Sequence, residues 1–167
     1  MNSIAADPGR PNWTIHGIFH PVISVSDMDV ALRFYRDVLG LRVTFDDHHD
    51  PRAISRLFGL AEPRVRSVIV ECSDASEVEL VEFQRPRGKS VVDRQMPDAG
   101  LAALNLRVTG MAALVDRIVA GGFAMGSEIV EQTLPDGAIL NVAVCRGPDG
   151  VTLILVEPPV GRRTLGG

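Results

Sequence analysis

Apolar and polar positions along the chain follow one order twice. In the first half, an apolar run over 18–25 predicts a strand, and apolar residues then recur with helical spacing from Val30 to Leu39. Gly40 ends this helix, because glycine is common just past a helix C-terminus. Further strands are predicted over 41–45, 64–71 and 77–83, with a polar loop over 46–51 and a short segment over 53–60. This half therefore has the order βαβββ.

The second half repeats that order. A strand is predicted over 104–108, and a helix with one apolar face over 111–120 is ended by Gly121 and Gly122. Strands follow over 127–133, 139–145 and 151–156. The turns between them, 134–137 and 147–150, both contain Pro-Asp-Gly.

A single βαβββ unit cannot bury both its sheet and its helix, so the two copies are expected to share a core. The predicted fold class is α+β, with two βαβββ repeats forming a curved mixed sheet around a cup and the helices outside. The expected organisation is a disordered N-terminal arm (1–14), a first module (15–84), a linker (85–100), a second module (101–158) and a flexible tail (159–167). The basic residues of the linker are expected to be solvated rather than to bind an anion.

Composition narrows the function classes. The 167 residues are 46% hydrophobic and 23% charged with a net charge of −4, which is ordinary for a globular protein and argues against a nucleic-acid binder. No apolar run approaches the roughly 18 residues of a membrane span. The N-terminus lacks the pattern of a signal peptide, so a cytoplasmic protein with two reduced cysteines is expected.

Aligning the two copies reveals an asymmetry in polar residues. Ala103 follows His20 by 83 residues, and Ile154 follows Glu79 by 75 residues. The same offsets relate Ser26 to Thr109 and Glu82 to Glu157. A slip of one residue would turn each strand's side chains to the wrong face. Only the first copy therefore places polar side chains at these two positions.

The motifs HPVISVSD (20–27), ALRFYRDVLG (31–40), VELVE (78–82) and GPDG (147–150) resemble the vicinal oxygen chelate superfamily. This group includes glyoxalase I, methylmalonyl-CoA epimerase, extradiol dioxygenases, fosfomycin-resistance enzymes and bleomycin-binding proteins. The likeness covers about residues 15–158. It implies a small-molecule ligand in the cup, a homodimer, and a metal held by up to four side chains.

The four positions that the resemblance assigns to metal ligands are His20, Glu79, Ala103 and Ile154. The last two cannot bind a metal, and one His with one carboxylate is a poor divalent site. We therefore expect no cofactor, with a divalent metal on His20 and Glu79 as the alternative. His48 and His49, in the predicted loop, could complete such a site or remain exposed.

Three functions follow for the cup. The first is a metal-independent isomerase, epimerase or lyase, in which His20 and a buried Glu79 with a raised pKa exchange protons. The second is a binding protein of the bleomycin-resistance type, and the third is a metal-dependent glyoxalase, epimerase or dioxygenase. Strand alternation adds the expected substrate-binding residues Ser24, Ala103, Asn105, Arg107 and Ile154.

Overall fold

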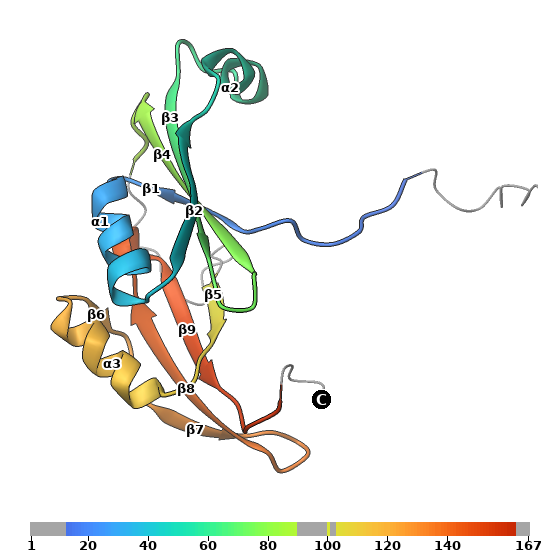
Figure 1. The fold of residues 1–167 in the computed structure, drawn as a ribbon, viewed down its shortest axis with the longest axis vertical. Helices are drawn as coiled ribbons and strands as arrows, with labels where there is room; N and C mark the ends of the chain where they lie inside the picture. Colours follow the sequence, from blue (N-terminus) through green and yellow to red (C-terminus); the bar gives the residue numbers. More distant parts are fainter. Residues whose placement is uncertain (1–12, 90–99, 101–102, 163–167) are drawn as a thin grey trace, which may run out of the picture.

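The computed structural model describes residues 13–89, 100 and 103–162 and contains two mixed sheets (Figure 1). The first has the strand order β1-β4-β3-β2, and the second has the order β5-β9-β8-β6 with β7 also paired to β8. The first-sheet strands are β1 (Val22–Val25), β2 (Arg42–His48), β3 (Arg64–Glu71) and β4 (Glu77–Arg85). The second-sheet strands are β5 (Ala103–Arg107), β6 (Ala124–Met125), β7 (Val130–Thr133), β8 (Ile139–Arg146) and β9 (Thr152–Glu157). The α+β class with two repeats is confirmed, and each repeat contributes its own sheet.

The register of the two parallel strand pairs reproduces the offsets of the sequence repeat. Val22 of β1 pairs with Glu79 of β4, and Asn105 of β5 pairs with Ile154 of β9. Asn105 follows Val22 by the same 83 residues that separate Ala103 from His20. The alignment that sets His20 against Ala103 is therefore a structural equivalence.

Two of the helices lie together on one side of the sheets (Figure 1). The first is α1 (Met28–Leu32), which Asp27 caps by accepting from the backbone N–H groups of Asp29 and Val30. It continues as the π-helical segment η1 (Arg33–Val38), a change in winding that the apolar spacing does not predict. The second is α3 (Met111–Ala120), whose first N–H groups donate to the Glu157 carboxylate.

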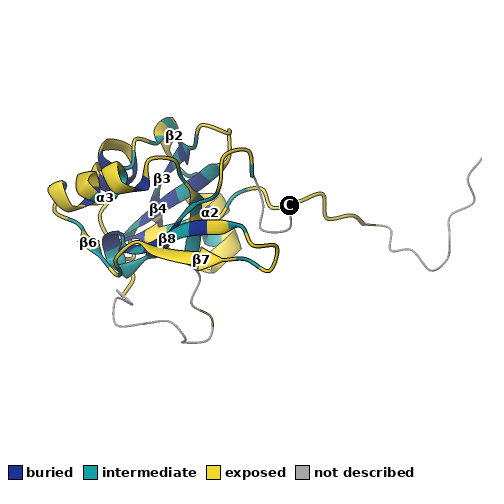
Figure 2. Ribbon diagram, turned by 90° about the horizontal axis from the view of Figure 1, so that it is seen from below, coloured by how far each residue is buried: buried dark blue, intermediate teal, exposed yellow. Residues whose placement is uncertain are grey.

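One core joins the two repeats. The Phe34 ring of η1 lies 4.6 Å from the Phe123 ring that follows α3, and a side chain added at Gly121 would meet Val38 at 2.6 Å. Buried residues of β3, β4, β8 and β9 face these helices, whereas β7 is exposed along its length (Figure 2). The helices α1 and α3 therefore cover one face of both sheets, and the cup is expected on the opposite face.

Two aspartates in equivalent hairpin turns connect each repeat to the other. Asp149, in the short helix η2 (Pro148–Gly150), accepts from the backbone N–H of Ser26 at 2.9 Å. Asp74, 75 residues earlier in the β3–β4 turn, accepts from Arg107 of β5 at 3.0 Å. Each turn therefore reaches the end of the other repeat's first strand.

The structure differs from the sequence expectations in the first repeat. β1 begins at Val22 rather than at residue 18, and 46–48 continue β2 instead of forming a loop. This polar run stays in the sheet because β2 is an edge strand, where Asp46 pairs with Arg66 at 2.7 Å. The helix α2 (Pro51–Phe58) follows, and its Ile54 packs with Val65 and Val81 on the sheet face away from α1.

Parts of the expected organisation lie outside the described residues. These are residues 1–12 of the arm, 90–99 and 101–102 of the linker and second module, and 163–167 of the tail.

Among the helices of the described part, none is long and apolar enough to cross a membrane.

Candidate functional site

The two polar residues singled out by the repeat lie together. Nε2 of His20 is 3.2 Å from Oε2 of Glu79, and both side chains are largely buried, at 11% and 14% exposed. The contact forms because β1 and β4 are parallel neighbours, with the backbone N–H of Glu79 donating to the carbonyl of Pro21. A side chain just before β1 thus reaches the same sheet face as position 79.

Two further side chains bind the other oxygen of the carboxylate. The hydroxyl of Ser67, from β3, donates to Oε1 of Glu79 and is 1% exposed. Nε2 of His49, directly after β2, lies 3.4 Å from the same oxygen. Glu79 therefore lies between two imidazoles, with His20 on one oxygen and His49 on the other.

These neighbours set the charge of Glu79. Burial alone would raise the pKa of this carboxyl, but the hydrogen bond from Ser67 and the contacts with the two imidazoles lower it below its usual value. The raised pKa that the sequence predicted is therefore wrong. Donors on both oxygens, which the sequence did not reveal, outweigh the effect of burial, so Glu79 is ionised at neutral pH.

An ionised Glu79 determines which nitrogen of His20 carries hydrogen. A carboxylate can only accept, so Nε2 must be the N–H donor, and in the neutral ring Nδ1 then holds the free lone pair. Nδ1 is buried and has no hydrogen-bond partner in the described structure. The nearest charged atom, Oε2 of Glu77, is 4.0 Å away, beyond hydrogen-bonding distance. A buried unpaired acceptor costs stability, which is a signal of function.

Side chains at the surface lie around this nitrogen. The ring of Phe19 lies 4.6 Å from the His20 ring and is 89% exposed, and Glu77 is about one-third exposed. Both can swing into solvent without disturbing the core, because neither is buried in it.

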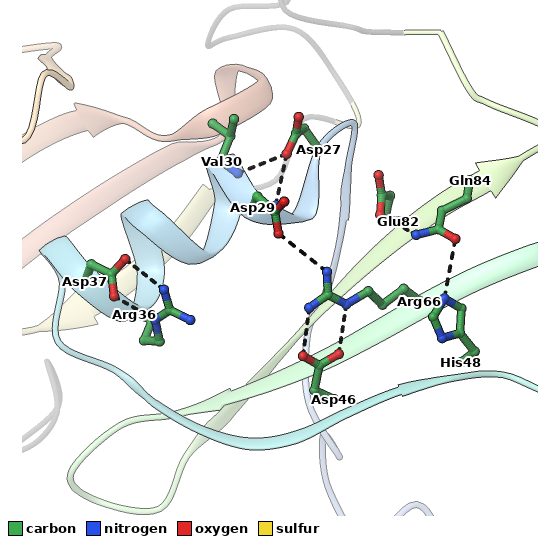
Figure 3. A network of polar contacts seen from close by, with 10 residues as sticks. All are labelled: Asp27, Asp29, Val30, Arg36, Asp37, Asp46, His48, Arg66, Glu82 and Gln84. Carbon is green, nitrogen blue, oxygen red and sulfur yellow. Dashed lines mark hydrogen bonds and ion pairs between the residues drawn. The ribbon is translucent and has the colours of Figure 1, made fainter.

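His48 belongs to a different network on the opposite side of the sheet (Figure 3). Its Nε2 lies 3.4 Å from the side-chain oxygen of Gln84, whose amide donates to Glu82 at 3.0 Å. Strand alternation explains the separation, since His48 and His49 are neighbours and point to opposite faces. Of the two histidines, the structure brings His49 to Glu79.

The residues present do not fit the metal site that the resemblance implies. Ala103 and Ile154 occupy the equivalent positions of the second repeat, and the two imidazoles contact opposite oxygens of Glu79 rather than a common point. Within residues 13–89, 100 and 103–162, no group of three or more His, Cys, Asp or Glu is arranged to hold a metal ion.

The expected substrate-binding residues occupy the first strand of each repeat and β9. Ser24 is exposed on β1, while Asn105, paired with Ile154, is exposed on β5 two residues after Ala103. No hydrogen bond or ion pair joins these side chains to His20 or Glu79 among the residues described. The guanidinium of Arg107 is held by Asp74 at 3.0 Å, so its charge is already partly balanced.

Sequence reasoning missed Ser67 at the site, and it left open whether His49 joins the site or stays exposed. Ser67 had a signal, because it is a polar residue on the cup-facing side of β3, between Val65 and Ile69. The direction of the His49 side chain had no such signal, because 46–51 was predicted to be a loop. That direction depends on β2 continuing to His48 and on the backbone N–H of His49 donating to the carbonyl of Val65.

Comparison with known proteins agrees with this fold. The family model for the Glyoxalase/Bleomycin resistance protein/Dioxygenase superfamily matches residues 17–155. The lactoylglutathione lyase-like protein terB of Aspergillus terreus is 24% identical over 94% of this chain and 81% of its own.

Solved structures show the same arrangement of elements. A glyoxalase family protein from Bacillus cereus has a TM-score of 0.78 at 18% identity, covering 89% of this chain and 98% of its own. The fosfomycin resistance protein FosX from Listeria monocytogenes, complexed with Mn(II) and sulfate, has a TM-score of 0.59 at 13% identity, covering 88% and 96%. At these identities the likeness concerns the fold.

Proposed function

Because the chain belongs to the Glyoxalase/Bleomycin resistance protein/Dioxygenase superfamily, we propose that it is a metal-independent enzyme acting on a small organic molecule. The reaction class is proton transfer at a carbon next to a carbonyl group, as in an epimerase, isomerase or lyase. The observation that carries the proposal is the unpaired, buried Nδ1 of His20 beside a Nε2 that is bound to an ionised carboxylate.

In this pair His20 is the base and Glu79 is the positioning group. Nδ1 of His20 takes the proton from carbon, and the electron pair of the broken C–H bond moves to the carbonyl oxygen as an enolate. Glu79 fixes the ring through Nε2 and stabilises the imidazolium that forms. Return of the proton to the other face, or to another carbon, gives the epimer or isomer, while loss of a leaving group gives the lyase product.

The cup-facing side chains would bind the substrate. Ser24 and Asn105 supply hydrogen-bond donors for the enolate oxygen or for substrate polar groups, and Ala103 and Ile154 supply apolar surface. Arg107 contributes less to substrate binding than its charge suggests, because its guanidinium is already paired with Asp74. His49, opposite His20 across Glu79, is placed to exchange a proton with the site.

A non-catalytic binding protein is the second candidate. The exposed apolar residues that precede β1 and the open face of the sheets suit sequestration of a drug or metabolite as well as catalysis. The two candidates differ in what His20 does. A base is essential for turnover, whereas a hydrogen-bonding partner contributes modest affinity.

Solvent deuterium exchange tests the proposal. The protein is incubated in D2O with a panel of small carbonyl compounds that carry an acidic C–H, and incorporation is followed by proton NMR. We expect exchange with at least one compound, and a loss of about 10²-fold or more in the His20→Ala variant. Exchange by His20→Ala at the wild-type rate would overturn the assignment.

Metal analysis separates the third candidate, a metal-dependent glyoxalase, epimerase or dioxygenase. We expect the purified protein to contain transition metal well below one equivalent per chain, and exchange to survive extensive treatment with a chelator. One equivalent of metal that is lost in His20→Ala would identify a metal enzyme with an unusual ligand set.

A further inference from the structure

A cavity of about 660 Å³ lies against the first strand of the first repeat. It is lined by residues 22–26, 86–89 and 149–151, together with Leu60 and Phe83. Consecutive strand residues point to alternate faces, so a cavity touched by all of 22–26 lies at the free edge of β1. That edge has no partner strand in the described structure, since β1 ends the order β1-β4-β3-β2. The volume is that of a small-molecule site.

Arg87 and Lys89 bring two exposed cations to this lining. Among the described residues, neither Arg87 nor Lys89 forms an ion pair, whereas Arg42, Arg66 and Arg107 are each paired with a carboxylate. The carboxylate of Asp149 also lines the cavity, but its Oδ2 already accepts from the backbone N–H of Ser26 at 2.9 Å. The lining therefore carries an excess positive charge on a protein whose net charge is −4.

The rest of the lining is apolar or hydroxyl-bearing. Leu60 and Phe83 belong to the small cluster beneath α2, where the ring of Phe58 meets Phe83 edge-on at 6.0 Å. Val22 is 58% exposed and offers apolar surface to the cavity. Ser24 adds a hydroxyl donor. This combination suits a molecule with an anionic end and an apolar body.

We propose that this cavity binds a small organic carboxylic acid, with its carboxylate at Arg87 and Lys89 and its apolar part against Val22, Leu60 and Phe83. Residues 86–89 of the expected linker are exposed, and in this proposal they also form one wall of the cavity. Val22 and Ser24 lie on the same face as His20, so the cavity begins, at Val22, roughly 6.6 Å along the chain from the catalytic base. A molecule anchored here by its carboxylate would extend toward Nδ1 of His20. Its identification as the substrate rests on the proposed function, whereas its binding does not.

Binding is tested with hexanoate as probe and hexanamide as its uncharged control. Each is titrated into the ¹⁵N-labelled protein while backbone amide shifts are followed. We expect hexanoate to shift the amides of 22–26 and 86–89, hexanamide to bind at least about tenfold more weakly, and added salt to weaken hexanoate alone. The double variant Arg87→Gln/Lys89→Gln should weaken hexanoate by about tenfold or more. The matched control Arg36→Gln/Arg42→Gln removes two exposed cations outside the cavity and should change nothing.

Equal binding of hexanoate and hexanamide would overturn the proposal, as would unchanged hexanoate binding by Arg87→Gln/Lys89→Gln or shifts confined to other surfaces. The titration is repeated on Glu79→Gln, which lacks the charge that the proposed reaction needs. Hexanoate binding that persists in this variant supports the cavity whether or not the catalytic proposal holds. Failure of deuterium exchange, by contrast, would remove the catalytic proposal and leave the cavity standing.

Discussion

His20 and Glu79 are joined through one ring nitrogen, with Nε2 3.2 Å from the carboxylate oxygen Oε2 while Nδ1 has no partner in the described structure. A pair that served stability alone would satisfy both nitrogens, because an unpaired buried acceptor costs about 1–3 kcal/mol. The contact with Glu79 instead fixes the His20 ring through Nε2 and leaves a basic lone pair on Nδ1. The predictions below depend on this division.

Replacing Glu79 with Gln tests its role as a positioning group. The amide can still accept from Nε2 but cannot neutralise the imidazolium, so we expect kcat to fall by about 10²-fold while KM changes little. Kinetics of the exchange reaction measure both constants. Glu77→Gln is the control, because it makes the same charge change on the same strand face 4.0 Å from Nδ1 and should cost less than about threefold. Equal losses in the two variants would point to a general charge effect.

Stability should depend on pH through Glu79. Its pKa in the folded protein lies below the ordinary value of 4.5, so the stabilisation from its ionised form is present above that pH and is lost as the pH falls through the folded pKa. The free energy of unfolding of wild type and Glu79→Gln, from urea titrations, should therefore differ most near neutral pH. The difference should shrink below about pH 4. A difference that stays constant with pH would contradict the lowered pKa.

Gly121→Ala tests the core shared by the two repeats. The φ of Gly121 is −73°, so alanine there is free of backbone strain and would ordinarily stabilise the chain. Its methyl group would nevertheless lie 2.6 Å from Val38 of the other repeat, and we expect a loss of about 1–3 kcal/mol in urea unfolding. Gly17→Ala, with nothing within 4 Å, is the control. A stabilised Gly121→Ala would mean that the repeats do not pack as described.

We predict a homodimer, because the apolar residues that precede β1 are exposed. Trp13, Ile15, Ile18 and Phe19 are 64–89% exposed on a segment that runs away from the body of the molecule (Figure 1). A second copy would cover them, and light scattering should give twice the chain mass of 18.0 kDa. The variant Ile15→Ser/Ile18→Ser should shift the mass toward 18.0 kDa. If the wild-type protein has the mass of one chain, the prediction of a dimer is wrong.

The sequence predicted the fold and the pairing of His20 with Glu79 because both follow from the repeat. Two copies with constant offsets set equivalent positions, and alternation then assigns faces. The sequence could not predict His49, because polar residues at 46–48 have low strand propensity and stay in the sheet through Arg66 on the neighbouring strand. It could not predict that Arg87 and Lys89, which are exposed, line a cavity, because the other lining residues come from β1 and η2, far away in the chain. The cytoplasmic location remains a prediction.

The tautomer of His20 tests the central claim most directly. Long-range ¹H–¹⁵N NMR of the imidazole at about pH 8.5, where an ordinary ring is neutral, distinguishes a protonated nitrogen from one with a free lone pair. His20→Ala assigns the signals. We predict that Nε2 carries the hydrogen and that Nδ1 has the shift of an unprotonated nitrogen. A hydrogen on Nδ1 would mean that no base faces the substrate, and would contradict the proposed mechanism.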